Sequence, residues 1–293
     1  EMLRSLVGSE MCIRDRRKIN MKKVRVLAGL ILCFAMIFAM VGCGEQKNPE
    51  KEENILCGIM NWQEPNDLGI FPTPALGEWK QYSSLTSMVL DLNAGNVEYL
   101  LVPASVASYL KAQDDSLTIA PGGAGVPTEI RMAVRAEDTE LHQLLQDGIQ
   151  TLREDGTLDD LIDTYITNVS TSGAAGGSQA DNEKTYVVGV TGDLPPLDYV
   201  AADGVPAGFN VALMNAISDK MDAVFTFVQV EADARLSALS SGKIDVIFWY
   251  GNVQGYTSER DELLITDEYY EDNVYYVTKS FDMNRILEAM RAQ

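Results

Sequence analysis

The stretch that decides the fold is Val187-Val-Gly-Val-Thr-Gly-Asp-Leu-Pro-Pro-Leu-Asp-Tyr199. It opens with a short apolar run typical of a buried strand, and Gly192 to Pro196 follow as a turn-forming segment. Further along, we expect Asp233 to cap a short helix that Gly242 stops, and Ile244–Trp249 has the pattern of a second buried strand. Strand, helix, glycine stop and strand in succession predict a βαβ crossover with parallel strands.

The first half of the chain contains the same unit. The apolar run Leu56–Ile59 is followed by a predicted helix that Ser83 or Ser84 caps and Gly95 stops, and then by the buried strand Val97–Val102. Both units share the spacing Leu-x-x-Gly-x-(Ile/Val)-(Asp/Glu), at Leu92 and at Leu239. The repeat predicts two α/β lobes, and the alternative is a single doubly wound sheet.

A stretch rich in glycine, serine and alanine separates the two units. Val169–Ala180 has no apolar periodicity, which is typical of a flexible linker. The predicted organisation is therefore an α/β half at 54–168, a linker at 169–184 and a second α/β half at 185–293.

Three motifs of the second half resemble one known family. Val187–Tyr199, Gly208-Phe209-Asn210 and Leu239–Ile247 are similar to the first lobe of the bacterial extracellular solute-binding proteins, family 3, which have the type II periplasmic-binding-protein fold. The resemblance implies two α/β lobes, each a mostly parallel sheet flanked by helices. It also implies that the lobes close on a polar solute.

The order of the lobes differs from that family. There the pattern opens the mature chain, whereas here residues that resemble the second lobe come first: Trp79–Tyr109, the returning strand Ile130–Val134 and the closing helical hairpin Asp138–Ile166. The resemblance thus implies a circular permutation, with the linker joining the family's usual termini. The alternative is a tandem array with a degenerate first domain and a shortened second one.

The N-terminal region has the features of a lipoprotein precursor. Residues 1–20 look like a non-native leader, and residues 21–42 combine a basic start with an apolar run, as in a secretory signal peptide. Gly42-Cys43 resembles a bacterial lipobox, which implies lipidation of Cys43 and a tether at 43–53. The alternative is an uncleaved signal anchor. Cys57 stands alone in the remainder, within an apolar run, so we expect a buried residue and no disulfide.

Composition argues against several function classes. The formal net charge of −20 disfavours a nucleic-acid partner. His142 is the single histidine, and the sequence has no Ser/His/Asp set, no Cys/His metal spacing and no glycine-rich phosphate loop. We therefore expect no catalytic residue, metal site or cofactor. A dehydratase-type enzyme on the same fold is the alternative, because paired carboxylates need no motif.

Candidate binding residues lie in loops that follow the predicted strands. In two-lobed α/β proteins, ligands bind where loops at the carboxyl ends of parallel strands face each other. The aromatic residues offer walls and the polar ones offer hydrogen bonds, although a tryptophan after a strand also suits a core, and Asp193 also suits a turn. The candidates are Asn61, Trp62, Ser105, Asp193, Leu194, Trp249, Tyr250 and Asn252.

Arg260 is a further candidate that comes from the resemblance. Thr257-Ser-Glu-Arg260 is similar to a Thr-x-x-Arg motif whose arginine binds the α-carboxylate of amino-acid ligands in the family. No acidic residue for an α-amino group stands at Val102–Ala104. An amino acid is therefore the default ligand, and a surface ion pair is the alternative role of Arg260.

The sequence thus predicts a monomeric, lipid-anchored substrate-binding protein on the outer face of a bacterial cell membrane. Its expected partners are a small polar solute and the permease of an ABC importer. The alternative with the same fold is a sensing or scaffolding lipoprotein with no transport role.

Overall fold

A computed structural model of the chain describes residues 56–61, 78–122, 127–168, 184–253 and 261–279, with the backbone alone at 249–253. The chain divides into two units, 1–53 and 54–293, and every described residue belongs to the second. The predicted leader, signal peptide, lipidation site at Cys43 and tether lie outside the described residues, as does the linker 169–183. None of the described helices has the length and apolar character needed to cross a membrane.

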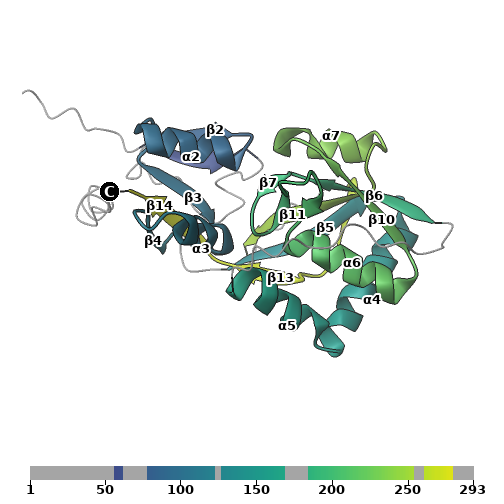
Figure 1. Cartoon of the computed structure of the whole chain (residues 1–293). Helices are drawn as coiled ribbons and strands as arrows, with labels where there is room; N and C mark the ends of the chain where they lie inside the picture. The colour runs from purple at the N-terminus through teal and green to yellow at the C-terminus, as the bar shows by residue number, and fades with distance from the viewer. Residues whose placement is uncertain (1–55, 62–77, 123–126, 169–183, 254–260, 280–293) are drawn as a thin grey trace, which may run out of the picture. The chain divides into compact units, whose positions relative to one another are not determined.

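The first sheet has the strand order β2-β1-β3-β14-β4 (Figure 1). We call this sheet and its two helices the small lobe. β1 is parallel to β2 and β3, whereas β14 is antiparallel to β3 and β4. The bounds are β1 Leu56–Met60, β2 Glu78–Tyr82, α2 Leu85–Ala94, β3 Tyr99–Pro103, α3 Ala104–Gln113, β4 Thr118–Pro121 and β14 Val274–Thr278.

The first half of α2 shows why this segment forms a helix. Ser84 is its N-cap, and the Ser84 side chain accepts a hydrogen bond from the Ser87 N–H at 3.2 Å. Gly95 ends the helix at φ 75°, a conformation that costs glycine little. Leu85, Met88 and Leu92 form the buried face. The predicted cap, stop and apolar face are confirmed.

The second sheet has the strand order β10-β6-β11-β5-β12, with β13 also paired to β5. We call it the large lobe, together with its helices and the small β7-β8-β9 sheet. The strands are β5 Thr128–Arg135, β6 Thr185–Val190, β7 Asp193–Leu194, β8 Asp198–Val200, β9 Pro206–Ala207, β10 Val224–Gln229, β11 Val246–Val253, β12 Leu263–Ile265 and β13 Tyr270–Asp272. The helices are α4 Thr139–Glu154, α5 Thr157–Ile162 with a π-helical turn to Thr167, α6 Phe209–Met221 and α7 Arg235–Ser240.

Each sheet contains a strand from the other half of the chain. β5 comes from the first half and lies between β11 and β12, while β14 comes from the second half and lies between β3 and β4. The two α/β lobes are as predicted. The sheets are more mixed than mostly parallel, because each inserted strand runs antiparallel to its neighbours.

One predicted helix start is wrong. Asp233 does not cap α7, because residues Ala232–Ala234 already form a 3₁₀ turn that leads into the helix. Ala234 occupies the N-cap position with φ −91° and ψ −8°, and no side chain caps it. Arg235 is buried at the first helical position and donates to the Phe248 carbonyl at 2.7 Å.

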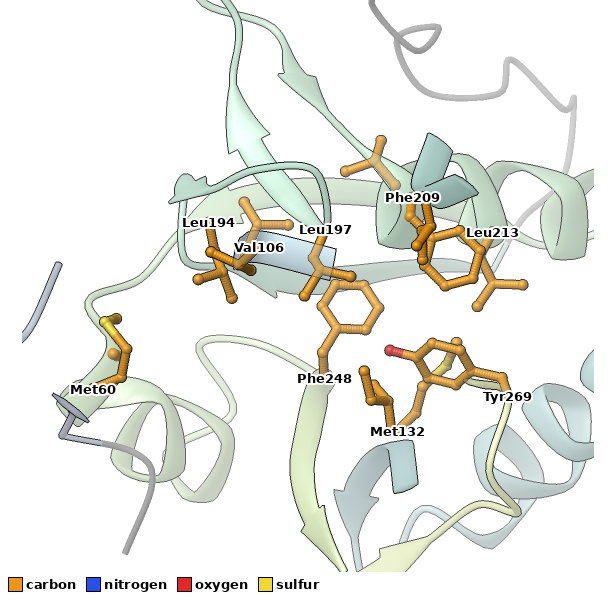
Figure 2. Packing of buried hydrophobic residues seen from close by; sticks show 14 of the residues in the cluster. Met60, Val106, Met132, Leu194, Leu197, Phe209, Leu213, Phe248 and Tyr269 are labelled. Carbon is orange, nitrogen blue, oxygen red and sulfur yellow. The ribbon is translucent and has the colours of Figure 1, made fainter. Parts of the chain in front are cut away.

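The largest hydrophobic cluster includes residues from both lobes. Met60 and Val106 belong to the small lobe, and Leu194, Phe209 and Phe248 belong to the large lobe (Figure 2). Cys57 lies in a second cluster that is confined to the small lobe, where burial raises the pKa of its thiol. The prediction that Cys57 is buried is confirmed, and its raised pKa disfavours the reactive thiolate.

Candidate functional site

Several predicted site residues lie outside the described residues, or in the part of β11 whose backbone alone is described. Trp62 and Arg260 lie outside the described residues, like Cys43. Trp249, Tyr250 and Asn252 belong to β11, and their backbones pair with β5, with an irregularity in register between Tyr250 and Asn252. Their part in a site therefore stays a prediction.

Two candidates are used in packing. The Leu194 side chain is 0% exposed within the main hydrophobic cluster, so it offers no surface to a solute in this conformation. Ser105 is also buried, and its hydroxyl donates to Asp272 at 2.6 Å. The sequence predicted both residues in strand-end loops, whereas Leu194 ends β7 and Ser105 lies in the first turn of α3. Residues distant in sequence contact both side chains.

Asn61 and Asp193 flank the start of α2. The Asn61 N–H donates to the Tyr82 carbonyl at 2.8 Å, which holds the end of β1 beside the segment that enters α2. The Asn61 Oδ1 is buried and has no hydrogen-bond partner among the described residues. From the large lobe, the Asp193 Oδ2 accepts from the Thr86 N–H at 3.3 Å. These groups form the candidate site between the lobes.

A buried polar network holds the loop that carries Asp193. The Asp198 Oδ1 accepts from the N–H of Thr191 at 2.7 Å and from the Thr191 hydroxyl. The Asp198 Oδ2 accepts from the Asn210 side chain at 3.0 Å, and the Tyr269 hydroxyl donates to the Asn210 Oδ1 at 2.9 Å. Sequence reasoning missed Asp198 and Asn210. Their signal is a polar residue between apolar neighbours, Leu197-Asp198-Tyr199 and Phe209-Asn210-Val211.

Gly208 lets the same loop dock on the start of α6. The N–H groups of Phe209 and Asn210 donate to the carbonyls of Pro196 and Leu197 at 2.9 and 2.8 Å. Gly208 has φ 109°, and a Cβ atom there would lie 2.5 Å from the Leu197 carbonyl oxygen. Only glycine fits this approach without moving backbone. The candidate loop is therefore fixed by both the Asp198 network and α6.

Asp272 links the lobes at the point where β13 passes into β14. Its carboxylate accepts from the Ser105 N–H at 3.2 Å and the Ser105 hydroxyl at 2.6 Å, at the start of α3. The Ala104 N–H donates to the Asn273 carbonyl at 2.7 Å. Asp272 is 4% exposed, and this burial raises its pKa to about 6 although the Ser105 donors oppose the shift.

The raised pKa of Asp272 predicts a pH effect on stability. Between the unfolded value of 3.8 and about 6, the folded protein holds a proton that the unfolded chain releases. The free energy of unfolding contributed by this group therefore falls as pH rises through that window, by up to about 3 kcal/mol. Urea unfolding of wild type and Asp272→Asn from pH 4 to 7 measures it. We expect wild type to lose stability relative to the variant; a constant difference contradicts the assignment.

Among the described residues, no group of three or more His, Cys, Asp or Glu side chains could hold a metal ion. His142 lies on α4 with its Nε2 3.1 Å from the Ile265 carbonyl oxygen. The described part of the candidate site holds two polar acceptors, the buried Asn61 Oδ1 and the Asp193 carboxylate, and the carboxylate accepts from the first turn of α2.

Comparison with known proteins gives one family match. Residues 186–288 match the bacterial extracellular solute-binding proteins, family 3. A segment of 98 residues is 31% identical to the L-arginine-binding protein of Pseudomonas aeruginosa, and covers 33% of this chain and 37% of that protein. The chain thus spans little more than a third of the length of this relative.

Solved structures give a partial likeness. The ligand-binding component of an ABC-type import system from Staphylococcus aureus, with zinc bound, has a TM-score of 0.43 at 10% identity, over 81% of this chain and 70% of that one. The reduced OxyR regulatory domain from Pseudomonas aeruginosa has a TM-score of 0.40 at 10% identity, over 81% and 95%. Residues 186–288, which include the loop of Asp193 and the Asp198 network, are thus similar to the bacterial extracellular solute-binding proteins, family 3.

Proposed function

We propose that this protein is the substrate-binding lipoprotein of an ABC importer, and that it binds a small, amino-acid-like solute between its two lobes. The observation that carries the proposal is the family match at 186–288, on a fold in which Asp193 of the large lobe accepts from the Thr86 N–H at the start of α2 in the small lobe. Lipidation at Cys43 would anchor the monomer outside the cell, beside its permease. The proposal assigns the protein no reaction.

The proposal includes a circular permutation of the lobes. Each sheet takes an internal strand from the other half of the chain, β5 in the large lobe and β14 in the small lobe. Two halves that complete each other in this way support a single permuted unit. A tandem array would instead leave each half to complete its sheets with strands of its own.

The mechanism follows from two lobes joined by crossing segments. A solute docks on one lobe, the other lobe closes over it, and the permease recognises the closed form. Arg260, which lies outside the described residues, is proposed to bind a ligand carboxylate through its planar guanidinium. The L-arginine-binding relative makes L-arginine the first solute to test on this chain.

A thermal-shift screen of amino acids, short peptides, sugars and polyamines tests the proposal. A solute at 100 times its Kd stabilises the protein by about 2.7 kcal/mol, because it binds the folded state alone. We expect a shift with at least one amino acid, and expect Arg260→Ala to abolish it. Arg153→Ala, which removes an exposed arginine on α4, is the matched control and should keep the shift. No shift with any of these solute classes contradicts the proposal.

A further inference from the structure

Three N–H groups in the first turn of α2 donate to side-chain acceptors. Ser84 satisfies one of them, since its side chain accepts from the Ser87 N–H, while its carbonyl accepts the first intrahelical bond from the Met88 N–H at 3.3 Å. The Thr86 N–H donates to Asp193 at 3.3 Å, and the Leu85 N–H is the second donor to the same carboxylate. A side chain of the large lobe thus completes a helix of the small lobe.

The loop that presents Asp193 is held from two sides. Thr191, two residues before Asp193, donates its N–H to Asp198. The Gln229 side chain donates to the Thr191 carbonyl at 3.2 Å. Gly192, at φ 84°, lies so close to Gln229 that a Cβ atom would come within 2.5 Å of the Gln229 Nε2. Asp193 therefore projects from a fixed position and is not free to follow α2 if the lobes separate.

Electrostatics favour the contact between the Asp193 carboxylate and the first turn of α2. Burial raises the pKa of Asp193, and the nearby carboxylates of Asp198 and Glu231 add to the rise, while the amide donors of Thr86 and Leu85 oppose it. The partial positive charge at a helix N-terminus is the main compensation that the half-buried carboxylate has in this network. Leaving α2 would remove that compensation.

Apolar packing continues the contact. Leu194, the next residue after Asp193, belongs to the same hydrophobic cluster as Met60 and Val106 of the small lobe (Figure 2). The lobes thus meet through a charged hydrogen bond beside a buried apolar patch.

We propose that Asp193 is a latch, whose carboxylate on the first turn of α2 holds the two lobes together. The proposal rests on the proposed function only in that the lobes must part to admit a solute. The latch occupies the place where a helix N-terminus would otherwise receive an anionic group, so a solute with a carboxylate competes with Asp193 for α2.

Hydrogen exchange and X-ray scattering on the solute-free full chain test the latch. In Asp193→Ala we expect the Leu85 and Thr86 amides to exchange about tenfold faster or more, because a hydrogen bond to a charged acceptor is lost. We also expect the radius of gyration to increase. Asp267→Ala, which removes an exposed carboxylate from the same lobe, is the matched control and should change neither quantity.

A second pair of variants keeps Asp193 and removes its partner. Proline is tolerated in the first turn of a helix, so Thr86→Pro deletes the donor without breaking α2, whereas Thr86→Ala keeps the donor. We expect Thr86→Pro to increase the radius of gyration as Asp193→Ala does, and Thr86→Ala to leave it unchanged. The latch is overturned if the radius of gyration is unchanged in both Asp193→Ala and Thr86→Pro. It is also overturned if the radius of gyration increases in Asp193→Ala but not in Thr86→Pro. Because no solute is added, failure here leaves the solute screen as a separate test of the proposed function.

Discussion

Asp198→Ala is expected to lower the free energy of unfolding by about 3–5 kcal/mol, which is a large part of the stability of an ordinary domain. The substitution removes the acceptor of three donors, the Thr191 N–H, the Thr191 hydroxyl and the Asn210 amide. Thr191, Asp198 and Asn210 are each 5% exposed or less. Water therefore cannot replace the carboxylate unless the surrounding residues rearrange. Each unpaired buried donor costs about 1–3 kcal/mol.

Urea unfolding followed by circular dichroism measures this effect. The matched control is Asp203→Ala, which removes an exposed carboxylate that accepts from the Val205 N–H at 3.1 Å in a turn of the same lobe. Solvent can replace that bond, so the control should cost less than about 1 kcal/mol. Equal losses in the two variants would mean that the Asp198 network does not hold the loop of Asp193.

The elements with local signals could be predicted from the sequence. The helix α2 was predicted with its cap at Ser84, its stop at Gly95 and its buried face, because each of these depends on neighbouring residues. The repeated βαβ unit was predicted for the same reason, and β1 and β6 indeed pair in parallel with β3 and β11. The start of α7 was mispredicted, because a 3₁₀ turn replaced the expected cap.

The site depends on contacts that sequence spacing does not reveal. Asp272 and Ser105 are 167 residues apart, Tyr269 and Asn210 are 59 apart, and Thr86 and Asp193 are 107 apart. The sequence identified Ser105 and Asp193 as polar candidates in strand-end loops, although Ser105 lies in the first turn of α3 and Asp193 begins β7. It did not show that Ser105 donates hydrogen bonds to Asp272, since that contact depends on how β14 crosses into the small lobe.

Cleavage of the chain between its two halves is expected to leave the two fragments associated. The large-lobe sheet contains β5 from the first half, hydrogen-bonded to β11 and β12, and the small-lobe sheet contains β14 from the second half, hydrogen-bonded to β3 and β4. Separating the halves would therefore break five strand pairings, because β13 also pairs with β5, and would open the hydrophobic cluster that both halves share. That cost opposes the entropy gained when two fragments separate.

The measurement is size-exclusion chromatography after cleavage at a specific protease site placed within residues 169–183. A permuted two-lobed unit predicts that both fragments elute together at the position of the uncut protein, and that they separate in 6–8 M urea, roughly the range that unfolds ordinary domains. Elution as two separate fragments under native conditions would contradict the central claim, because it would mean that the two halves fold as independent units of a tandem array.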